Sequence, residues 1–216
     1  MRRFAGTLLI ALGFLCLLAA GWFVRFNYSI QEDAGIHAKQ VLMNLEIPSQ
    51  LDSTQSDDQL LGVQAPTVAI EEIPDYILNP EMDMPERDVD GVAYIGAISI
   101  PSLEIDLPVI STTSKALLRI APCRYTGSAY LDNLVIGAHN YSTHFGRIKN
   151  LSYGDLIEFT DMDGNLFVYQ VADMEVLNPD QVDDLCAGQW PLTLYTCTIG
   201  GRTRVTVRCD KVETHG

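Results

Sequence analysis

The chain begins MRRFAGTLLIALGFLCLLAAGWFVRF, and this apolar run constrains its fold more than any other feature. Residues 4–24 contain no charged side chain. As a helix they would extend over about 30 Å, which matches the hydrocarbon core of a bilayer. Arg2 and Arg3 precede the run, and positive charge favours the cytoplasmic side of a membrane. We therefore expect residues 1–28 to form a cytoplasmic stub and a single-pass transmembrane signal anchor.

A cleaved signal peptide is the alternative interpretation of this run. Leu18 stands where cleavage requires a small residue, and the apolar run is long for a signal peptide. A lipoprotein site at Cys16 is disfavoured because Leu15 precedes it. These observations favour an uncleaved anchor in the cell membrane, with the larger part of the chain outside the cell.

The segment after the anchor divides into a helix and a linker. Residues 29–46 favour a helix, whereas residues 47–90 are rich in Asp, Glu, Pro, Ser and Gln and contain very few basic residues. Such a composition buries little apolar area and is typical of a self-repelling linker. We expect residues 29–90 to form an extracytoplasmic helix and an acidic linker.

The net charge of −14 disfavours a nucleic-acid partner, because phosphate binding requires basic patches.

Residues 91–216 carry a pattern of short strands and form the predicted folded domain. The stretch AYIGAISIPSLEIDLPVIS predicts two strands, and a hairpin turn is expected at DMDGN, which lacks the spacing of an EF-hand. Short strands with few helical stretches predict a small β-barrel or sandwich. The further strand-like runs are residues 130–137, 155–160, 166–171, 193–197 and 203–209, and residues 178–188 suit a short helix or a connecting loop.

Cys197 is the first candidate for chemistry. It ends a predicted strand and precedes a Gly-Gly loop, so its sulfur could be exposed at a rim. Arg202 and Arg204 follow, and nearby positive charge favours the thiolate form of a cysteine. Taken alone, a cysteine at a strand end is more often a buried apolar residue or half of a disulfide.

A cysteine nucleophile requires an imidazole within reach. His139 follows the apolar run LVIGA and is the preferred candidate, with His144 as its competitor. His37 and His215 lie near the anchor and the C-terminus, and we interpret both as solvated. A metal site at His139 and His144 is disfavoured because no third and fourth ligands cluster nearby in the sequence.

The last predicted strand supplies a guanidinium group. Strand alternation places Arg204, Thr206 and Arg208 on one face and the valines on the other. The valines favour the core, so Arg204 faces away from it, at the end nearest the cysteine loop. A guanidinium there could stabilise an oxyanion or hold substrate carbonyls.

In combination, these residues resemble the sortases, the cell-wall transpeptidases of Gram-positive bacteria. TLYTC at residues 193–197 matches the family's Thr-Leu-x-Thr-Cys, and RVTV at residues 204–207 matches its arginine strand. VIGAHN at residues 135–140 resembles the histidine strand, with Ala138 where Gly is usual. The resemblance covers roughly residues 92–213, and FGRI, YGD and ISIP resemble further family elements.

The resemblance implies a mostly β fold, an eight-stranded β-barrel with short helices. It also implies that the Cys197 thiolate attacks the threonine carbonyl of an LPxTG-like C-terminal sorting signal. His139 would protonate the leaving amine and then assist an incoming amine, while Arg204 would stabilise the oxyanion and position the signal. The partners implied are surface proteins bearing such a signal and an amine of peptidoglycan or of a pilin. No cofactor and no metal are required.

The subfamily indications differ from one another. Asn140 and Phe145-Gly146 look like class B, whereas the short connection before residue 193 disfavours the long class B insertion. The linker lacks the Asp-Pro-aromatic lid motif of pilin-polymerising enzymes. We therefore favour a housekeeping or accessory anchoring enzyme.

Two other functions stay open at the level of sequence. A cysteine peptidase would form the same acyl-enzyme and release it to water. A non-catalytic surface binding barrel would instead pair Cys197 with Cys209 or Cys123 in a disulfide, and the pairing of Cys186 is equally open.

Overall fold

The computed structural model describes residues 2–48 and 73–212 of the 216-residue chain. Most of the predicted acidic linker, residues 49–72, lies outside the described residues, as does His215. The helices are α1 (Arg2–Asn44), α2 (Asp75–Leu78) and α3 (Val182–Leu185), with 3-10 turns η2 (Pro101–Leu103), η3 (Leu117–Arg119), η4 (Ala129–Leu131) and η5 (Phe145–Asn150). The strands are β1 (Arg87–Val89), β2 (Val92–Ile100), β3 (Ile105–Ile110), β4 (Cys123–Thr126), β5 (Leu134–Ala138), β6 (Leu156–Asp161), β7 (Leu166–Leu177), β8 (Leu192–Cys197) and β9 (Arg204–Lys211).

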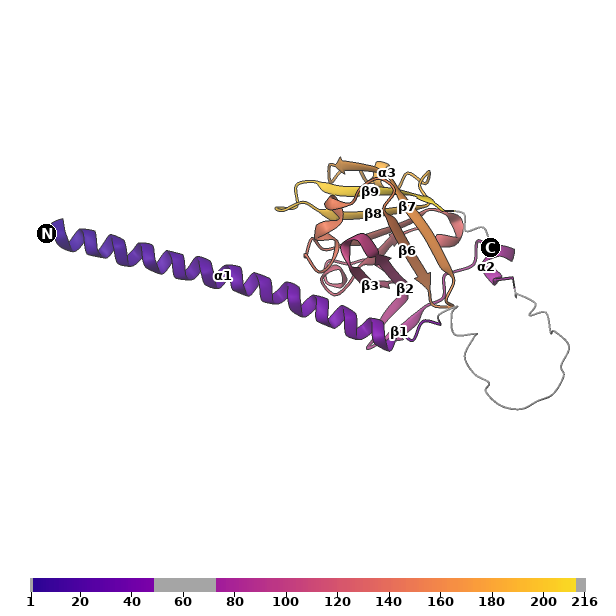
Figure 1. Cartoon of the computed structure of the whole chain (residues 1–216), viewed down its shortest axis with the longest axis horizontal. Helices are drawn as coiled ribbons and strands as arrows, with labels where there is room; N and C mark the ends of the chain where they lie inside the picture. Colours follow the sequence, from indigo (N-terminus) through magenta and orange to yellow (C-terminus); the bar gives the residue numbers. More distant parts are fainter. Residues whose placement is uncertain (1, 49–72, 213–216) are drawn as a thin grey trace.

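The described strands form one closed sheet, seen beside the long helix α1 in Figure 1. Their order is β1-β2-β3-β4-β5-β8-β9-β7-β6, and antiparallel pairing of β2 with β6 closes the ring. The strands β2 to β9 therefore make an eight-stranded barrel, and β1 is a short addition beside β2. The prediction of a mostly β, eight-stranded barrel with short helices is confirmed.

Strand alternation places the core inside the barrel. Ile136, Leu194 and Val207 lie opposite one another on β5, β8 and β9, and all three are buried. They belong to a large apolar cluster that includes aromatic side chains of β6 and β7. The expected hairpin between β6 and β7 is also present, and the carboxylate of Asp161 accepts hydrogen bonds from the backbone nitrogens of Asp163 and Asn165.

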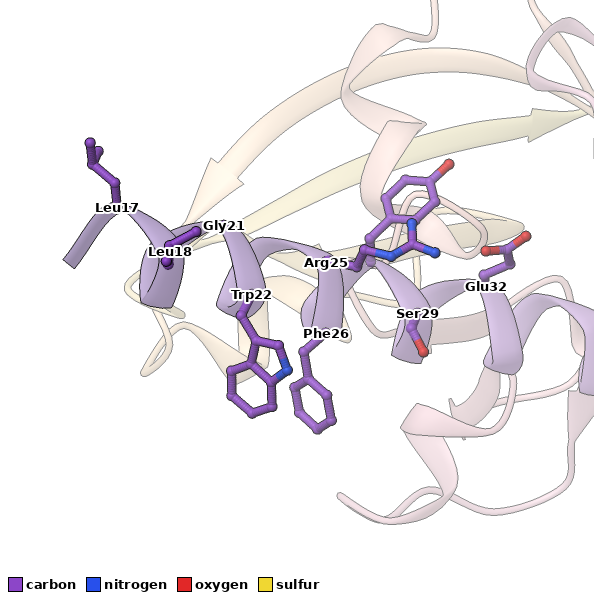
Figure 2. A pocket seen from close by; sticks show the side chains of 9 residues that line it. Leu17, Leu18, Gly21, Trp22, Arg25, Phe26, Ser29 and Glu32 are labelled. Atoms are coloured by element: carbon purple, nitrogen blue, oxygen red, sulfur yellow. The ribbon is translucent and has the colours of Figure 1, made fainter. Parts of the chain in front are cut away.

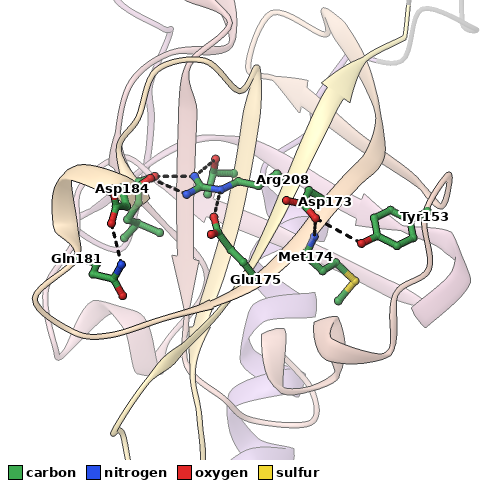
Figure 3. Close-up of polar contacts among 9 residues, drawn as sticks. Tyr153, Asp173, Met174, Glu175, Gln181, Asp184 and Arg208 are labelled. Carbon is green, nitrogen blue, oxygen red and sulfur yellow. Dashed lines mark hydrogen bonds and ion pairs between the residues drawn. The ribbon is translucent and has the colours of Figure 1, made fainter.

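The opposite face of β9 is covered rather than solvated. Arg208 is only 2% exposed because the connection between β7 and β8, including α3, lies over it. Its guanidinium donates to the backbone oxygens of Leu185 and Asp184, to Thr193 Oγ1 and to the Glu175 carboxylate (Figure 3). A buried guanidinium requires such a full set of acceptors. Arg208 therefore holds the connection onto the sheet.

A single continuous helix replaces the separate anchor and extracytoplasmic helix expected from the sequence. The part of it at Leu12–Asn44 is apolar and long enough to cross a membrane, judged by length and composition. Large apolar side chains of this part are exposed, and Trp22 stacks on Phe26 on one side of the helix (Figure 2). The absence of a helix-breaking residue between residues 25 and 29 explains why the helix continues.

The end of α1 packs on the barrel. Ala38 belongs to the main core cluster, while Val41 and Leu45 join a second cluster beside Tyr94 and Ile110. These helix positions recur at intervals of three and four residues and therefore form one stripe.

Ordered structure begins earlier than the domain boundary expected at residue 91. The strand β1 starts at Arg87, and Met84 is buried in the core. Further upstream, Tyr76 of α2 stacks on Tyr130 with ring centroids 4.7 Å apart. Apolar residues within the acidic segment therefore dock on the barrel, although the composition of the segment as a whole is that of a linker.

The Arg208 contacts predict a large effect of one substitution on stability. Replacing Arg208 with methionine should lower the free energy of unfolding by about 3 kcal/mol, because buried oxygens lose their donor. Arg202→Met, at an exposed loop position, should leave stability nearly unchanged. Denaturant unfolding of both variants measures this, and equal stabilities would contradict the structural role of Arg208.

Candidate active site

Three neighbouring strands carry rows of side chains on the outer face of the barrel. Val135, Thr193 and Arg208 form the first row, because β5 pairs parallel with β8 and β8 pairs antiparallel with β9. The β7–β8 connection covers this row through Leu185, which packs with Val135. The second row consists of Gly137, Tyr195 and Thr206.

The third row contains the residues expected to be catalytic. Cys197 lies directly opposite Arg204, and directly opposed residues have Cβ atoms about 5 Å apart. Ala138 lies beside Thr196, so the next residue, His139, leaves β5 beside Cys197. Strands in a sheet lie about 4.8 Å apart. The register therefore places His139, Cys197 and Arg204 at the ends of three neighbouring strands.

Cys197 is the exposed last residue of strand β8. Cys197 is exposed, whereas the five preceding residues of β8 are all buried. The hydroxyl of Thr196 donates to the carbonyl oxygen of Ala138 at 2.9 Å, and this buried bond ties the end of β8 to the end of β5. The backbone that carries Cys197 is consequently held against the backbone that carries His139.

Arg204 is positioned by contacts that the sequence does not reveal. Its Nη1 atom donates to the backbone oxygen of Pro179, in the β7–β8 connection, at 2.9 Å. Its guanidinium carbon lies 5.9 Å from the centre of the Tyr195 ring, a distance at which a cation is attracted to the ring face. The Pro179 carbonyl and the Tyr195 ring therefore both hold the guanidinium near the end of β9.

Tyr195 and Gly137 pack against each other in the second row, next to the row that contains Cys197 and Arg204. The sequence analysis assigned no role to either residue. A Cβ atom on Gly137 would lie 2.4 Å from Tyr195 Cζ, so only glycine leaves room for the ring. Tyr125 meets Tyr195 edge to face at 5.7 Å. The only sequence signal was the position of both residues within the matched motifs.

His139 is half-buried and lies against Tyr141, with ring centroids 3.9 Å apart. Its Nδ1 atom is buried without a hydrogen-bond partner among the described residues. Burial, followed by the nearby positive charge of Arg119, lowers the pKa of the His139 imidazole. The neutral imidazole is therefore favoured, and it can accept a proton.

His144, the competing histidine, occupies a different environment. It is fully buried, and neither ring nitrogen has a hydrogen-bond partner in the described part of the chain. Burial, and to a smaller extent the neighbouring His139, lowers its pKa to about 4. His144 is therefore enclosed in the core, whereas His139 is only half-buried and directly follows the end of β5.

The cysteines of the described residues are all free. Cys209 lies opposite Leu192, at the far end of β8 from Cys197. The strand length between them is about 17 Å. Cys123 lies opposite Gly137 on β4, so two strand spacings, about 10 Å, separate it from β8. A disulfide requires Cα atoms within roughly 7 Å, and both pairings of the binding-barrel hypothesis are therefore excluded by the register.

A closed β-barrel with a thiol, an imidazole and a guanidinium at the ends of three adjacent strands defines a class of protein. The family model described as Sortase domain matches residues 98–212, more than half of the chain. The chain belongs to the sortase family.

Relatives outside the family model agree with this. Sortase A of Bacillus anthracis is 32% identical over 123 residues, which cover 53% of this chain and 57% of that protein. The chain thus spans little more than half the length of this curated relative.

Among solved structures, sortase C1 from Streptococcus agalactiae superposes with a TM-score of 0.51 at 26% identity, covering 59% of this chain and 72% of that one. A pilus-related sortase C of Group B Streptococcus gives a TM-score of 0.50 at 26% identity, covering 60% and 71%. These relatives are sortases A and C, and none of them supports the class B indications noted around His139.

The burial of His144 predicts a pH dependence of stability. Its folded pKa is lowered to about 4 from an ordinary value of 6.5, so between these values only the unfolded chain binds the proton. The free energy of unfolding should therefore fall as pH decreases from about 6.5 to 4, with a contribution from His144 of up to about 3 kcal/mol.

Denaturant unfolding of the wild type and of His144→Gln across this range measures that contribution. The variant should lose less stability on acidification, whereas His37→Gln, at an exposed position, should follow the wild type. Parallel curves for wild type and His144→Gln would show that His144 is not the group responsible.

Proposed function

We propose that this protein is a membrane-anchored cysteine transpeptidase. It cleaves an LPxTG-like C-terminal sorting signal and transfers the cleaved protein to an amine of the cell wall or of a pilin. The observation that carries this proposal is the register that sets His139, Cys197 and Arg204 side by side. Family membership supports the reaction class, and the exposure of Cys197 leaves its sulfur accessible to a peptide.

Acylation begins with proton transfer from Cys197 to the neutral imidazole of His139. The sulfur then attacks the carbonyl carbon of the threonine in the signal, and negative charge develops on the carbonyl oxygen. Arg204 pairs with Cys197 across the two strands, and its guanidinium stabilises that oxygen. His139 returns its proton to the leaving amine, and a thioester on Cys197 remains.

The long apolar helix suits an enzyme whose substrates arrive at the membrane. We propose that α1 spans the bilayer, with Arg2 and Arg3 on the cytoplasmic side and the barrel outside. Anchoring raises the effective concentration of enzyme at the surface where exported proteins emerge. The named sortase C relatives also make a pilin amine a reasonable acceptor beside peptidoglycan.

The proposal is tested with the full-length chain in detergent micelles and a library of LPxTG-like peptides, with and without amines. Mass spectrometry should detect an acyl adduct on Cys197 that amines release faster than water does. Cys197→Ala should form no adduct, whereas Cys186→Ala, which removes another partly accessible thiol, should react normally. An adduct that survives in Cys197→Ala would contradict the proposal, and release that no amine accelerates would indicate a cysteine peptidase.

The role of Arg204 predicts a selective loss of rate. Arg204→Lys should lower kcat/KM for the signal peptide about 100-fold, because a point charge does not reproduce the hydrogen bonds of the guanidinium to a developing oxyanion. Arg202→Lys is the matched control, since Arg202 is an exposed arginine of the loop that leads into β9. Equal rates for the two variants would exclude Arg204 from oxyanion stabilisation.

A further inference from the structure

The helix α1 is held against the loop that follows His139. The side-chain oxygen of Gln31 accepts hydrogen bonds from the backbone nitrogen and the hydroxyl of Ser142, at 3.0 and 3.1 Å. The hydroxyl of Thr143 donates to the backbone oxygen of Gln31 at 2.8 Å. A Cβ atom on Gly35 would lie 2.9 Å from Thr143, so the helix approaches the loop as closely as glycine allows. This part of α1 is therefore a fixed neighbour of the candidate active site.

A cavity of about 570 Å³ lies between this part of the helix and the barrel. His139, Tyr141 and Arg119 line it on the barrel side. The wall contributed by α1 consists of Asn27, Ile30, Ala34 and His37. Asn27 is close to the end of the apolar run, so the cavity lies next to the part of the chain that we propose to be in the membrane.

Arg119 gives the cavity its chemical character. It is exposed, forms no ion pair among the described residues, and is the one side chain of the cavity wall that carries a permanent charge. A guanidinium pairs with a carboxylate through two parallel hydrogen bonds. The same charge repels an ammonium group and thereby favours the neutral, nucleophilic form of an amine.

We propose that this cavity binds the acceptor, a primary amine whose molecule also carries a carboxylate, with Arg119 holding the carboxylate and α1 forming one wall. This inference rests on the proposed transpeptidase function. It makes helix α1 part of the acceptor site and places that site on the His139 side of Cys197, whereas Arg204 pairs with Cys197 from β9, the neighbouring strand on the other side of β8.

The transfer step balances with the groups present. The neutral amine nitrogen forms a bond to the threonine carbonyl carbon of the thioester on Cys197. The C–S bond then breaks, and the sulfur leaves with the electron pair as a thiolate. The proton lost by the amine passes to the imidazole of His139, a residue that lines the cavity. A new amide is the product.

The first test compares glycine with glycinamide as acceptors for the full-length enzyme in detergent micelles. The two amines differ in intrinsic reactivity, so the relevant quantity is the ratio of their kcat/KM values in each variant. Arg119→Gln should reduce the ratio of glycine to glycinamide about tenfold. Lys115→Gln removes the same charge from a nearby exposed position and should leave the ratio unchanged. An unchanged ratio in Arg119→Gln would overturn the carboxylate assignment.

The second test fills the cavity from the helix side. Ile30→Trp and Ala34→Trp should slow release of the acyl-enzyme by glycine at least tenfold, while formation of the acyl adduct and its release by water continue. Ile36→Trp, on a part of α1 that does not line this cavity, is the control. Normal release by glycine in Ile30→Trp and Ala34→Trp would overturn the placement of the acceptor.

The adduct also distinguishes the two proposals. If no acyl adduct forms on wild-type Cys197, the transpeptidase function itself fails. If the adduct forms but its release by amines is insensitive to Arg119 and to the cavity-filling substitutions, only the acceptor site fails.

Discussion

The pairing of β8 with β5 on one side and β9 on the other is the constraint on which the rest of the site depends. Parallel and antiparallel neighbours fix which residues share a row, and a shift of one residue would turn every side chain of β8 to the other face. In the observed register the last row contains Cys197 and Arg204, with His139 directly after β5. The buried hydrogen bond from the Thr196 hydroxyl to the Ala138 carbonyl secures this register at the ends of β8 and β5, next to Cys197 and His139.

The barrel leaves only one of these rows open. Arg208 holds the β7–β8 connection over the first row, and Tyr195 fills the space above Gly137 in the second. The third row, which contains Cys197 and Arg204, is covered neither by the β7–β8 connection nor by the Tyr195 ring. The backbone carbonyl of Pro179, in that connection, accepts a hydrogen bond from Arg204. The same connection therefore stabilises the sheet and orients a candidate catalytic side chain, so mutations in it should affect stability and rate together.

Strand alternation and the family resemblance together predicted much of this from the sequence. The barrel, the strand ends at His139 and Cys197, and the outward face of Arg204 follow from a two-residue period and from the family motifs. The burial of Arg208 was not predictable, because it depends on how the connection between β7 and β8 folds over the outer face of β9. The continuation of α1 beyond its apolar run and its contacts with the His139 loop also depend on residues distant in the sequence, and the linker composition concealed β1.

The central claim is that Arg204 and His139 flank a reactive Cys197. The most direct measurement is a crystal structure of the full chain with a signal-peptide aldehyde bound covalently to the enzyme, because the hemithioacetal oxygen mimics the oxyanion. We predict an adduct on Cys197, its oxygen within hydrogen-bonding distance of the Arg204 guanidinium, and the His139 imidazole beside the sulfur. An adduct on Cys186, or an oxygen turned away while Arg204 remains on the Pro179 carbonyl, would contradict the account.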